Sequence, residues 1–255
     1  MESDIDIDGL GRIARRAGAE ILEVYGRDFE VETKEDQSPL TEADRRSNEV
    51  IVGALREGYP DIPFISEETR AVGYEERRHW ERFWLIDPLD GTKEFVKRNG
   101  EFTVNIALIE RGVPVAGVVY QPVGDRLYYA VEGNGSFLVE EGGDPLRLSA
   151  GAHYRDRDKV LVVASRSHLT PEVEAFVEEL RAGGKKVEFL SAGSSLKLCL
   201  VAEGRAAVYP RLGPTMEWDT GAAHAVVIEA GKEVLDFVTR RPLVYNKENL
   251  LNPFF

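Results

Sequence analysis

The sequence predicts an α/β protein in two parts, an α+β half over residues 1–155 and an α/β half over residues 156–255. The first half is predicted by a segment with helical spacing of apolar residues, by a capping signal for a second helix, and by the β-rich runs that follow. The second half is predicted by strands and helices that alternate one by one, as in layered α/β units. A chain of 255 residues could form one large domain or two smaller ones that share a core.

The first half begins with two predicted helices. Apolar residues recur at helical spacing over residues 8–25, and a glycine ends the run. A short strand is expected at 29–33, and a polar segment broken by proline follows it. Thr41 is then a good N-cap for a second helix that reaches about residue 58. Residues 62–66 predict a further strand.

A sheet is expected next. The apolar run 83–86 is typical of a strand buried on both faces. Pro88 predicts that this strand ends at Asp87, because proline cannot donate a hydrogen bond to the sheet ladder. Later β-rich runs, separated by glycine-containing turns, predict an antiparallel meander at 102–110, 113–121, 126–131 and 136–139.

The polar segment 144–159 is the expected boundary between the two halves. Beyond it the element type alternates, which predicts strands at 160–164, 186–190 and 206–209 and helices at 171–182, 195–202 and 220–230.

Composition limits the possible functions. A net charge of −13 argues against a nucleic-acid surface, which would need a basic stripe. The single cysteine, Cys199, excludes an internal disulfide and fits a reducing cytoplasm. The acidic N-terminal residues do not resemble a signal peptide, and no apolar run approaches the roughly 20 residues of a membrane span. We therefore expect a cytoplasmic protein that does not bind nucleic acid.

The candidate reactive centre follows the strand at 83–86. Asp87 and Asp90 flank a turn, so two carboxylates come together at the end of a core strand and repel each other unless a proton or a cation intervenes. Gly91 allows close approach of the backbone, and Thr92 adds a hydroxyl and an amide. Hard oxygen ligands without nearby cysteine or histidine favour magnesium over zinc. The alternative is an ordinary hairpin turn, for which Asp-Gly is a common signal.

Two further acids in the first half have open alternatives. Asp44, three residues after Thr41, fits a capping box at the start of the second helix. It could equally lie beside Asp87 and Asp90 and orient a catalytic hydroxyl. Glu67 follows the strand at 62–66, where an acid is often a solvated loop residue.

Candidates in the second half also have structural alternatives. Asp219 precedes a helix and could be a simple N-cap. The stretch 193–197, with Ser194, Ser195 and Lys197, opens another helix and could hold a phosphate or merely cap that helix. Arg211 ends a strand and could bind a phosphate or remain in solvent. Among the histidines, His168 alone has the position of a site residue, at a strand end.

These motifs together resemble the inositol monophosphatase superfamily of magnesium-dependent, lithium-sensitive phosphatases. The matching stretches are SPLTEAD, SEE, WLIDPLDGTKEF and WDTGAAHAV, in that order and over nearly the full chain. The stretches SRSH, GSSLKLCLVAEG, YPRLGPT and LNP are similar to the bisphosphate nucleotidase branch of that superfamily. The resemblance implies a layered αβαβα sandwich.

The resemblance also implies roles for individual residues. Thr92 and Asp44 would help Glu67 and a metal to activate water, while the amides of Gly91 and Thr92 would meet the scissile phosphate. Substrate contacts are expected from Asp219 and from residues of the second half, namely His168, Ser194, Ser195, Lys197 and Arg211. The metal shell would consist of Glu67, Asp87, the carbonyl of Leu89, Asp90 and Asp219.

The implied reaction is removal of the 3'-phosphate of 3'-phosphoadenosine 5'-phosphate, giving AMP and phosphate. About two or three magnesium ions would act at the site, and Li⁺ would inhibit. The alternatives are an inositol-1-monophosphatase or fructose-1,6-bisphosphatase-like activity, or a non-enzymatic calcium-binding module. A haloacid-dehalogenase-type phosphatase is disfavoured because its acids lie two positions apart, whereas these lie three apart. No stable protein partner is evident, so a monomer or homodimer is expected, with peripheral attachment to the inner membrane left open.

Overall fold

The largest sheet has seven strands in the order β3-β4-β5-β6-β7-β8-β9. β3 and β4 are parallel, and each later neighbouring pair is antiparallel, as the turn signals predict. The computed structural model describes residues 5–33, 39–69, 72–164 and 170–255. The strands are β3 (Phe64–Ser66), β4 (Arg82–Asp90), β5 (Thr103–Glu110), β6 (Val113–Gln121), β7 (Arg126–Val131), β8 (Gly135–Glu140) and β9 (Leu146–Arg147).

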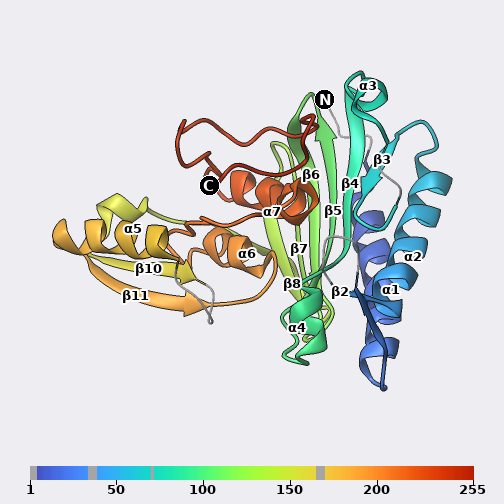
Figure 1. The fold of residues 1–255 in the computed structure, drawn as a ribbon, viewed down its shortest axis with the longest axis horizontal. Coiled ribbons are helices and arrows are strands. Elements are labelled where there is room, and N and C mark those ends of the chain that lie inside the picture. The colour runs from blue at the N-terminus through green and yellow to red at the C-terminus, as the bar shows by residue number, and fades with distance from the viewer. Residues whose placement is uncertain (1–4, 34–38, 70–71, 165–169) are drawn as a thin grey trace.

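Two helices, α1 (Ile7–Tyr25) and α2 (Glu42–Gly58), cover one face of this sheet (Figure 1). Their apolar stripes are buried against the sheet, where Trp84, Ile106 and Val118 belong to the same core cluster. Such a stripe is what the helical spacing of apolar residues predicts. The N-cap of α1 is Asp6, whose Oδ1 accepts a hydrogen bond from the Gly9 amide at 2.8 Å.

The opposite face carries α7 (Glu217–Glu229), which is apolar nearly all round and therefore buried. Small residues allow it to approach the sheet closely. A Cβ atom added to Gly117 on β6 would lie only 2.3 Å from the carbonyl oxygen of Ala222, so glycine is required at that crossing. This close packing joins α7, which comes late in the chain, to strands formed by the first half.

The second half forms a smaller layered unit around the parallel pair β10 (Lys159–Ala164) and β11 (Lys186–Ser191). α6 (Leu196–Ala202) packs on one face of this pair and α5 (Pro171–Ala182) on the other. The layers therefore run from α1 and α2 through the large sheet, α7 and α6, and the small sheet to α5 (Figure 1). The predicted αβαβα arrangement is confirmed, while the division at residues 155 and 156 remains a prediction.

Several predicted boundaries differ from the structure. The strand expected at 206–209 is reduced to an isolated bridge between Val162 and Val208. α7 begins at Glu217, three residues before the expected start at residue 220. The strand expected at 29–33 is shorter in the structure, where it is β1 (Val31–Thr33). It pairs antiparallel with β2 (Pro39–Thr41), a segment that was not predicted to be a strand. The remaining short elements are α3 (Tyr74–Arg77), α4 (Thr92–Val96) and the 3₁₀ turn η1 (Tyr154–Asp156).

The prediction that the central strand ends at Asp87 is wrong. β4 continues to Asp90, and the ladder with β5 is interrupted rather than ended. Pro88 is tolerated because it lies in a bulge, where no ladder hydrogen bond is required of it.

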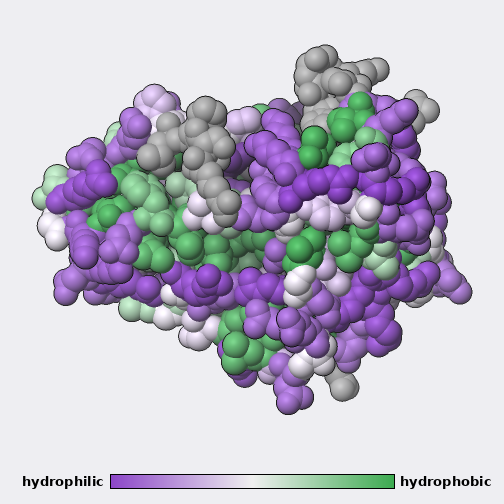
Figure 2. All heavy atoms as spheres, turned by 90° about the horizontal axis from the view of Figure 1, so that it is seen from below, coloured by the Kyte–Doolittle hydropathy of each residue, from purple (hydrophilic) through white to green (hydrophobic). Residues whose placement is uncertain are grey.

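Apolar side chains also gather on part of the surface. Figure 2 shows a band of them across the underside, mainly below the second half and bordered by hydrophilic residues. Within the part of the chain that the structure describes, none of the helices has the length and apolar character needed to cross a membrane.

Candidate metal centre and active site

Three carboxylates converge where the large sheet meets the second half. One oxygen each of Asp87, Asp90 and Asp219 lies within 4.8 Å of the others. Asp87 and Asp90 come from the end of β4, and Asp219 comes from the first turn of α7. The two segments are far apart in sequence, so only the packing of α7 on the sheet brings the third acid to the first two.

A β-bulge explains why the two acids of β4 lie on the same side. Asp87 is paired with Asn105 and Asp90 with Thr103, so β4 advances three residues where β5 advances two. Side chains alternate along a strand, and the extra residue therefore turns positions three apart onto one face. The bulge is held by the Leu89 amide, which donates to Asp87 Oδ1 at 3.1 Å.

The acids strongly perturb one another. Burial raises the pKa of Asp87 well above its usual range, and the charges of Glu67, Asp90 and Asp219 raise it further. Burial and the charge of Asp90 raise the pKa of Asp219 to about 8. Without a cation, this environment favours the protonated forms of Asp87 and Asp219. Carboxylate oxygens at this spacing fit a hard divalent cation such as Mg²⁺.

Glu67 reaches this group through strand pairing. The parallel register of β3 on β4 places Ser66 opposite Ile86, and the Glu67 amide donates to the Ile86 carbonyl at 3.2 Å. Glu67 is consequently next to Asp87, with which it shares a side-chain hydrogen bond. The solvated-loop alternative for Glu67 is therefore not what the structure shows.

Asp44 makes the capping-box contacts and also contacts the Thr92 hydroxyl. Its Oδ2 accepts hydrogen bonds from the Thr41 amide at 2.7 Å and the Thr41 hydroxyl at 2.6 Å. These bonds are part of the capping box at the start of α2. Its Oδ1 accepts from the Thr92 hydroxyl at 3.3 Å. The same carboxylate thus closes the start of α2 and contacts the hydroxyl that follows Asp90 and Gly91.

Asp219 is not the N-cap of α7. It is the third helical residue, and its Oδ2 accepts a hydrogen bond from the amide of the cap residue, Met216, at 2.8 Å. The helix begins earlier than predicted because Glu217 and Trp218 are already helical. Asp219 therefore supports the helix start with one oxygen while it belongs to the acidic cluster.

Ser194 and Ser195 contact Asp90. Its Oδ2 accepts hydrogen bonds from the Ser194 hydroxyl at 2.6 Å, the Ser195 amide at 2.6 Å and the Ser195 hydroxyl at 2.8 Å. Ser194 has a left-handed backbone conformation, φ +53°, at the turn that precedes α6. These two serines connect the acid of the first half to the second half.

Sequence reasoning missed a second set of polar residues behind the serines. Thr103 and Asn105 lie fully buried on β5. The Asn105 amide donates to Ser195 Oγ at 2.9 Å, and the hydroxyls of Thr103 and Ser194 lie 2.6 Å apart. The signal was a threonine and an asparagine at alternate positions of an otherwise apolar strand, which places both on one face.

The predicted anion-binding residues line the same cavity as two acids of the cluster. A cavity of about 300 Å³ is bordered by Asp90, Asp219, Lys197, Arg211 and Tyr209, among others. The Lys197 ammonium donates to the Ser194 carbonyl at 3.0 Å, and an Arg211 Nη donates to the Pro214 carbonyl at 2.9 Å. Arg211 Nε is buried and has no hydrogen-bond partner among the described residues.

Of the predicted site residues Gly91 and His168, the structure describes only Gly91. Gly91 lines the cavity with φ +90°, and a Cβ there would lie 3.2 Å from the Ser194 Cβ and 3.3 Å from the Glu101 carbonyl oxygen. A side chain at Gly91 would thus be strained and crowded. His168 lies outside the described residues.

The chain is similar to known proteins over nearly its whole length. The model of the inositol monophosphatase family matches residues 7–253. The chain is 48% identical over 252 residues to the 3'(2'),5'-bisphosphate nucleotidase CysQ of Escherichia coli strain K12, which covers 98% of each chain. The crystal structure of CysQ from Bacteroides thetaiotaomicron matches with a TM-score of 0.84 and 46% identity, over 97% of this chain and 95% of that one. The inositol monophosphatase TM1415 of Thermotoga maritima matches with a TM-score of 0.74 and 27% identity, over 97% and 90%.

Proposed function

The chain belongs to the inositol monophosphatase family, and we propose that it is a metal-dependent 3'(2'),5'-bisphosphate nucleotidase. The proposed reaction is hydrolysis of the 3'-phosphate of 3'-phosphoadenosine 5'-phosphate to AMP and phosphate. The observation that carries this proposal is that two acids of the cluster, Asp90 and Asp219, border one cavity together with the cationic side chains of Lys197 and Arg211. Similarity to proteins named CysQ nucleotidase over nearly the whole chain supports the choice of substrate.

The metal ligands in this proposal are the side chains of Glu67, Asp87, Asp90 and Asp219 and the carbonyl of Leu89. Divalent cations bound there would neutralise the phosphate, lower the pKa of the attacking water and stabilise the leaving oxygen. The protein contributes a rigid arrangement: the bulge fixes two acids, and the serines at the start of α6 fix Asp90 through three hydrogen bonds.

Thr92 and Asp44 are proposed to accept the proton of the attacking water. The Thr92 hydroxyl has two acceptors at 3.3 Å, Asp44 Oδ1 and the Leu89 carbonyl. With the Leu89 carbonyl bound to a metal, the hydroxyl would donate to Asp44, and an oxygen lone pair of Thr92 could accept a hydrogen bond from water. Asp44 Oδ2 is already held by two donors of Thr41, which limits rotation of the carboxylate. Proton transfer from water through the hydroxyl to Asp44 would then need little movement. A purely structural calcium site has no use for this hydroxyl–carboxylate pair.

The second phosphate of the substrate is proposed to bind at Lys197 and Arg211. Both cations border the cavity, and the unpartnered Arg211 Nε provides a buried donor that an anion would satisfy. A substrate with a single phosphate would gain nothing from this second anion site. The site therefore favours a nucleotide bisphosphate over inositol 1-phosphate.

The proposal is tested by comparing turnover of 3'-phosphoadenosine 5'-phosphate and inositol 1-phosphate by the same magnesium-loaded preparation. Lys197→Ala and Arg211→Ala should each raise KM for the bisphosphate by about tenfold, because a hydrogen bond between charged groups is worth about 1.5–3 kcal/mol. Turnover of inositol 1-phosphate should change little. Arg205→Ala is a matched control, since this exposed cation is paired with Glu203 and does not border the cavity.

Three outcomes would contradict the proposal in different ways. A wild-type preference for inositol 1-phosphate would indicate a monophosphatase of the same family. Equal effects of the two variants on both substrates would remove the second anion site. Absence of phosphate release from either substrate in the presence of magnesium would favour a calcium-binding module.

A further inference from the structure

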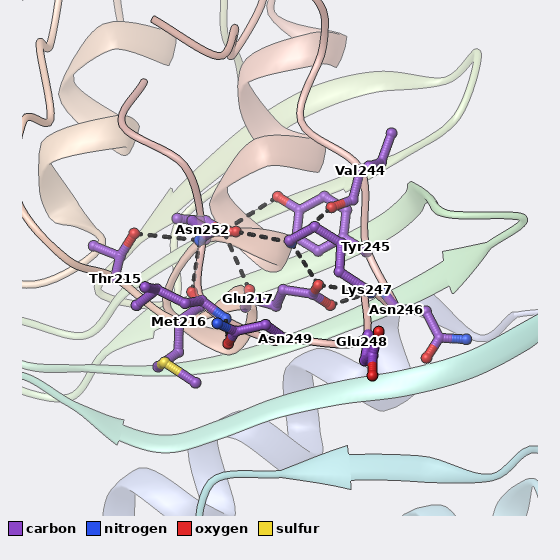
Figure 3. Close-up of polar contacts among 12 residues, drawn as sticks. Thr215, Met216, Glu217, Val244, Tyr245, Asn246, Lys247, Glu248, Asn249 and Asn252 are labelled. Atoms are coloured by element: carbon purple, nitrogen blue, oxygen red, sulfur yellow. Dashed lines mark hydrogen bonds and ion pairs between the residues drawn. The ribbon is translucent and has the colours of Figure 1, made fainter. Parts of the chain in front are cut away.

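The segment from Val244 to Asn252 runs across the start of α7 and is hydrogen-bonded to it (Figure 3). The Glu217 amide donates to the Leu250 carbonyl at 2.9 Å, and the Asn252 amide donates to the Thr215 carbonyl at 2.8 Å. The segment is therefore attached by its backbone to the residues just before and within the first helical turn.

A buried ion pair strengthens this attachment. The Glu217 side chain is fully buried, and its carboxylate accepts hydrogen bonds from the Lys247 ammonium at 2.5 Å, the Lys247 amide at 3.0 Å and the Asn246 amide at 2.7 Å (Figure 3). A buried carboxylate is tolerated when it is paired and hydrogen-bonded in this way. Glu217 lies two residues before Asp219, but its partners are Lys247 and Asn246, which do not belong to the acidic cluster.

Asn252 holds the residue that binds Asp219. The Asn252 side-chain amide donates to the Met216 carbonyl at 2.8 Å, to Thr220 Oγ1 at 3.0 Å and to Thr215 Oγ1 at 3.2 Å. The Met216 amide in turn donates to Asp219 Oδ2 at 2.8 Å. A single buried side chain therefore bonds both Thr215 and Met216, the two residues that precede α7 (Figure 3).

We infer that Asn252 is a positioning residue for the metal ligand Asp219, with Lys247 and Glu217 securing the segment that carries it; the identity of the metal rests on the proposed function. Loss of the Asn252 side-chain amide would remove one donor from each of the Met216 carbonyl, Thr220 Oγ1 and Thr215 Oγ1, and would loosen the residues at the start of α7. The Met216 carbonyl would keep the Asp219 amide at 3.2 Å, and Thr220 Oγ1 would keep the Tyr245 hydroxyl at 3.2 Å. The Asp219 carboxylate would then sample more orientations, and metal affinity would fall. Changes to residues that orient a metal ligand typically lower metal affinity by about 10–100-fold.

The test is Mn²⁺ binding to the metal-free protein, followed by the electron paramagnetic resonance signal of unbound Mn²⁺. Asn252→Ala should raise the dissociation constant by about tenfold, and it should raise the Mg²⁺ concentration for half-maximal turnover by a similar factor. Excess Mg²⁺ should restore kcat, because the catalytic groups are unchanged. Asn249→Ala is the matched control, since this exposed asparagine of the same segment accepts a hydrogen bond from the Leu251 amide of its own loop and forms no hydrogen bond with Met216 or Asp219.

The outcomes separate positioning from general stability. Wild-type Mn²⁺ affinity in a folded Asn252→Ala protein with a lowered Tm would overturn the inference, as would equal weakening by Asn249→Ala. If Asn252→Ala does not fold, Asn252→Ser is measured, and wild-type affinity in that variant would also overturn it. Because Mn²⁺ binding needs no substrate, a wild type that binds Mn²⁺ but hydrolyses no phosphate ester would contradict the proposed function alone.

Discussion

Replacement of Asp219 by asparagine should remove a pH-dependent destabilisation of the metal-free protein. The pKa of this carboxyl is raised to about 8 by burial and by the charge of Asp90. In the unfolded chain an aspartate has a pKa of about 3.9. Between these two values the folded protein holds a proton that the unfolded chain has released, so stability is complete below about pH 4 and falls as the pH rises towards about 8. Asparagine keeps the acceptor for the Met216 amide but has no proton to hold.

The size of the effect follows from proton linkage. One proton difference changes the free energy of unfolding by about 1.4 kcal/mol per pH unit, hence by about 2.7 kcal/mol between about pH 5 and about pH 7. For a chain of this length each kcal/mol shifts Tm by about 2–4 °C, which gives a difference of about 5–10 °C. A divalent cation at 100 times its dissociation constant restores about 2.7 kcal/mol, a contribution of the same size.

The assay is denaturant unfolding of chelator-treated wild type, Asp219→Asn and the exposed control Asp61→Asn at both pH values. Acids distant from the cluster titrate alike in all three proteins, so the difference between variant and wild type reports Asp219 together with its effect on the pKa of Asp87. We expect wild type and the control to lose more stability than Asp219→Asn as the pH rises, and Mg²⁺ to reverse that loss only in the proteins that keep Asp219. An identical pH dependence in wild type and Asp219→Asn would refute the reasoning.

Three further predictions concern the reaction. Asp87→Asn or Asp90→Asn should nearly abolish phosphate release while the circular dichroism spectrum stays native, and wild-type activity of either variant at limiting magnesium would show that the metal assignment is wrong. Thr92→Ala should lower kcat by about 10²-fold, the scale of a lost proton-transfer group. Asp44→Asn should do the same, whereas normal turnover with a stability loss of about 1 kcal/mol would mean that Asp44 acts only as a cap. Millimolar lithium should inhibit where millimolar sodium does not, and equal turnover in the two salts would count against this type of site.

Local patterns in the sequence were sufficient to predict most of the helices and strands. Helical spacing of apolar residues identified α1, the Thr41 cap marked the start of α2, and the apolar run 83–86 and the later β-rich runs identified β4 to β8. The pattern did not show that β4 continues past Pro88. A proline is excluded from a regular ladder but not from a bulge, and a bulge is defined by the partner strand.

The acids of the site could be named from the sequence, but their partners could not. The spacing of Asp87 and Asp90 suggested a pair of carboxylates, and only the register with β5 explains how both face one side. Hydrogen bonds from Ser194 and Ser195 to Asp90 and from Asn252 to Met216 join segments far apart in the chain. Such contacts depend on how α7 and the second half pack on the sheet. Local sequence determines which groups can bind a cation, whereas tertiary packing decides which groups orient them, because orientation is set by neighbours that local periodicity does not encode.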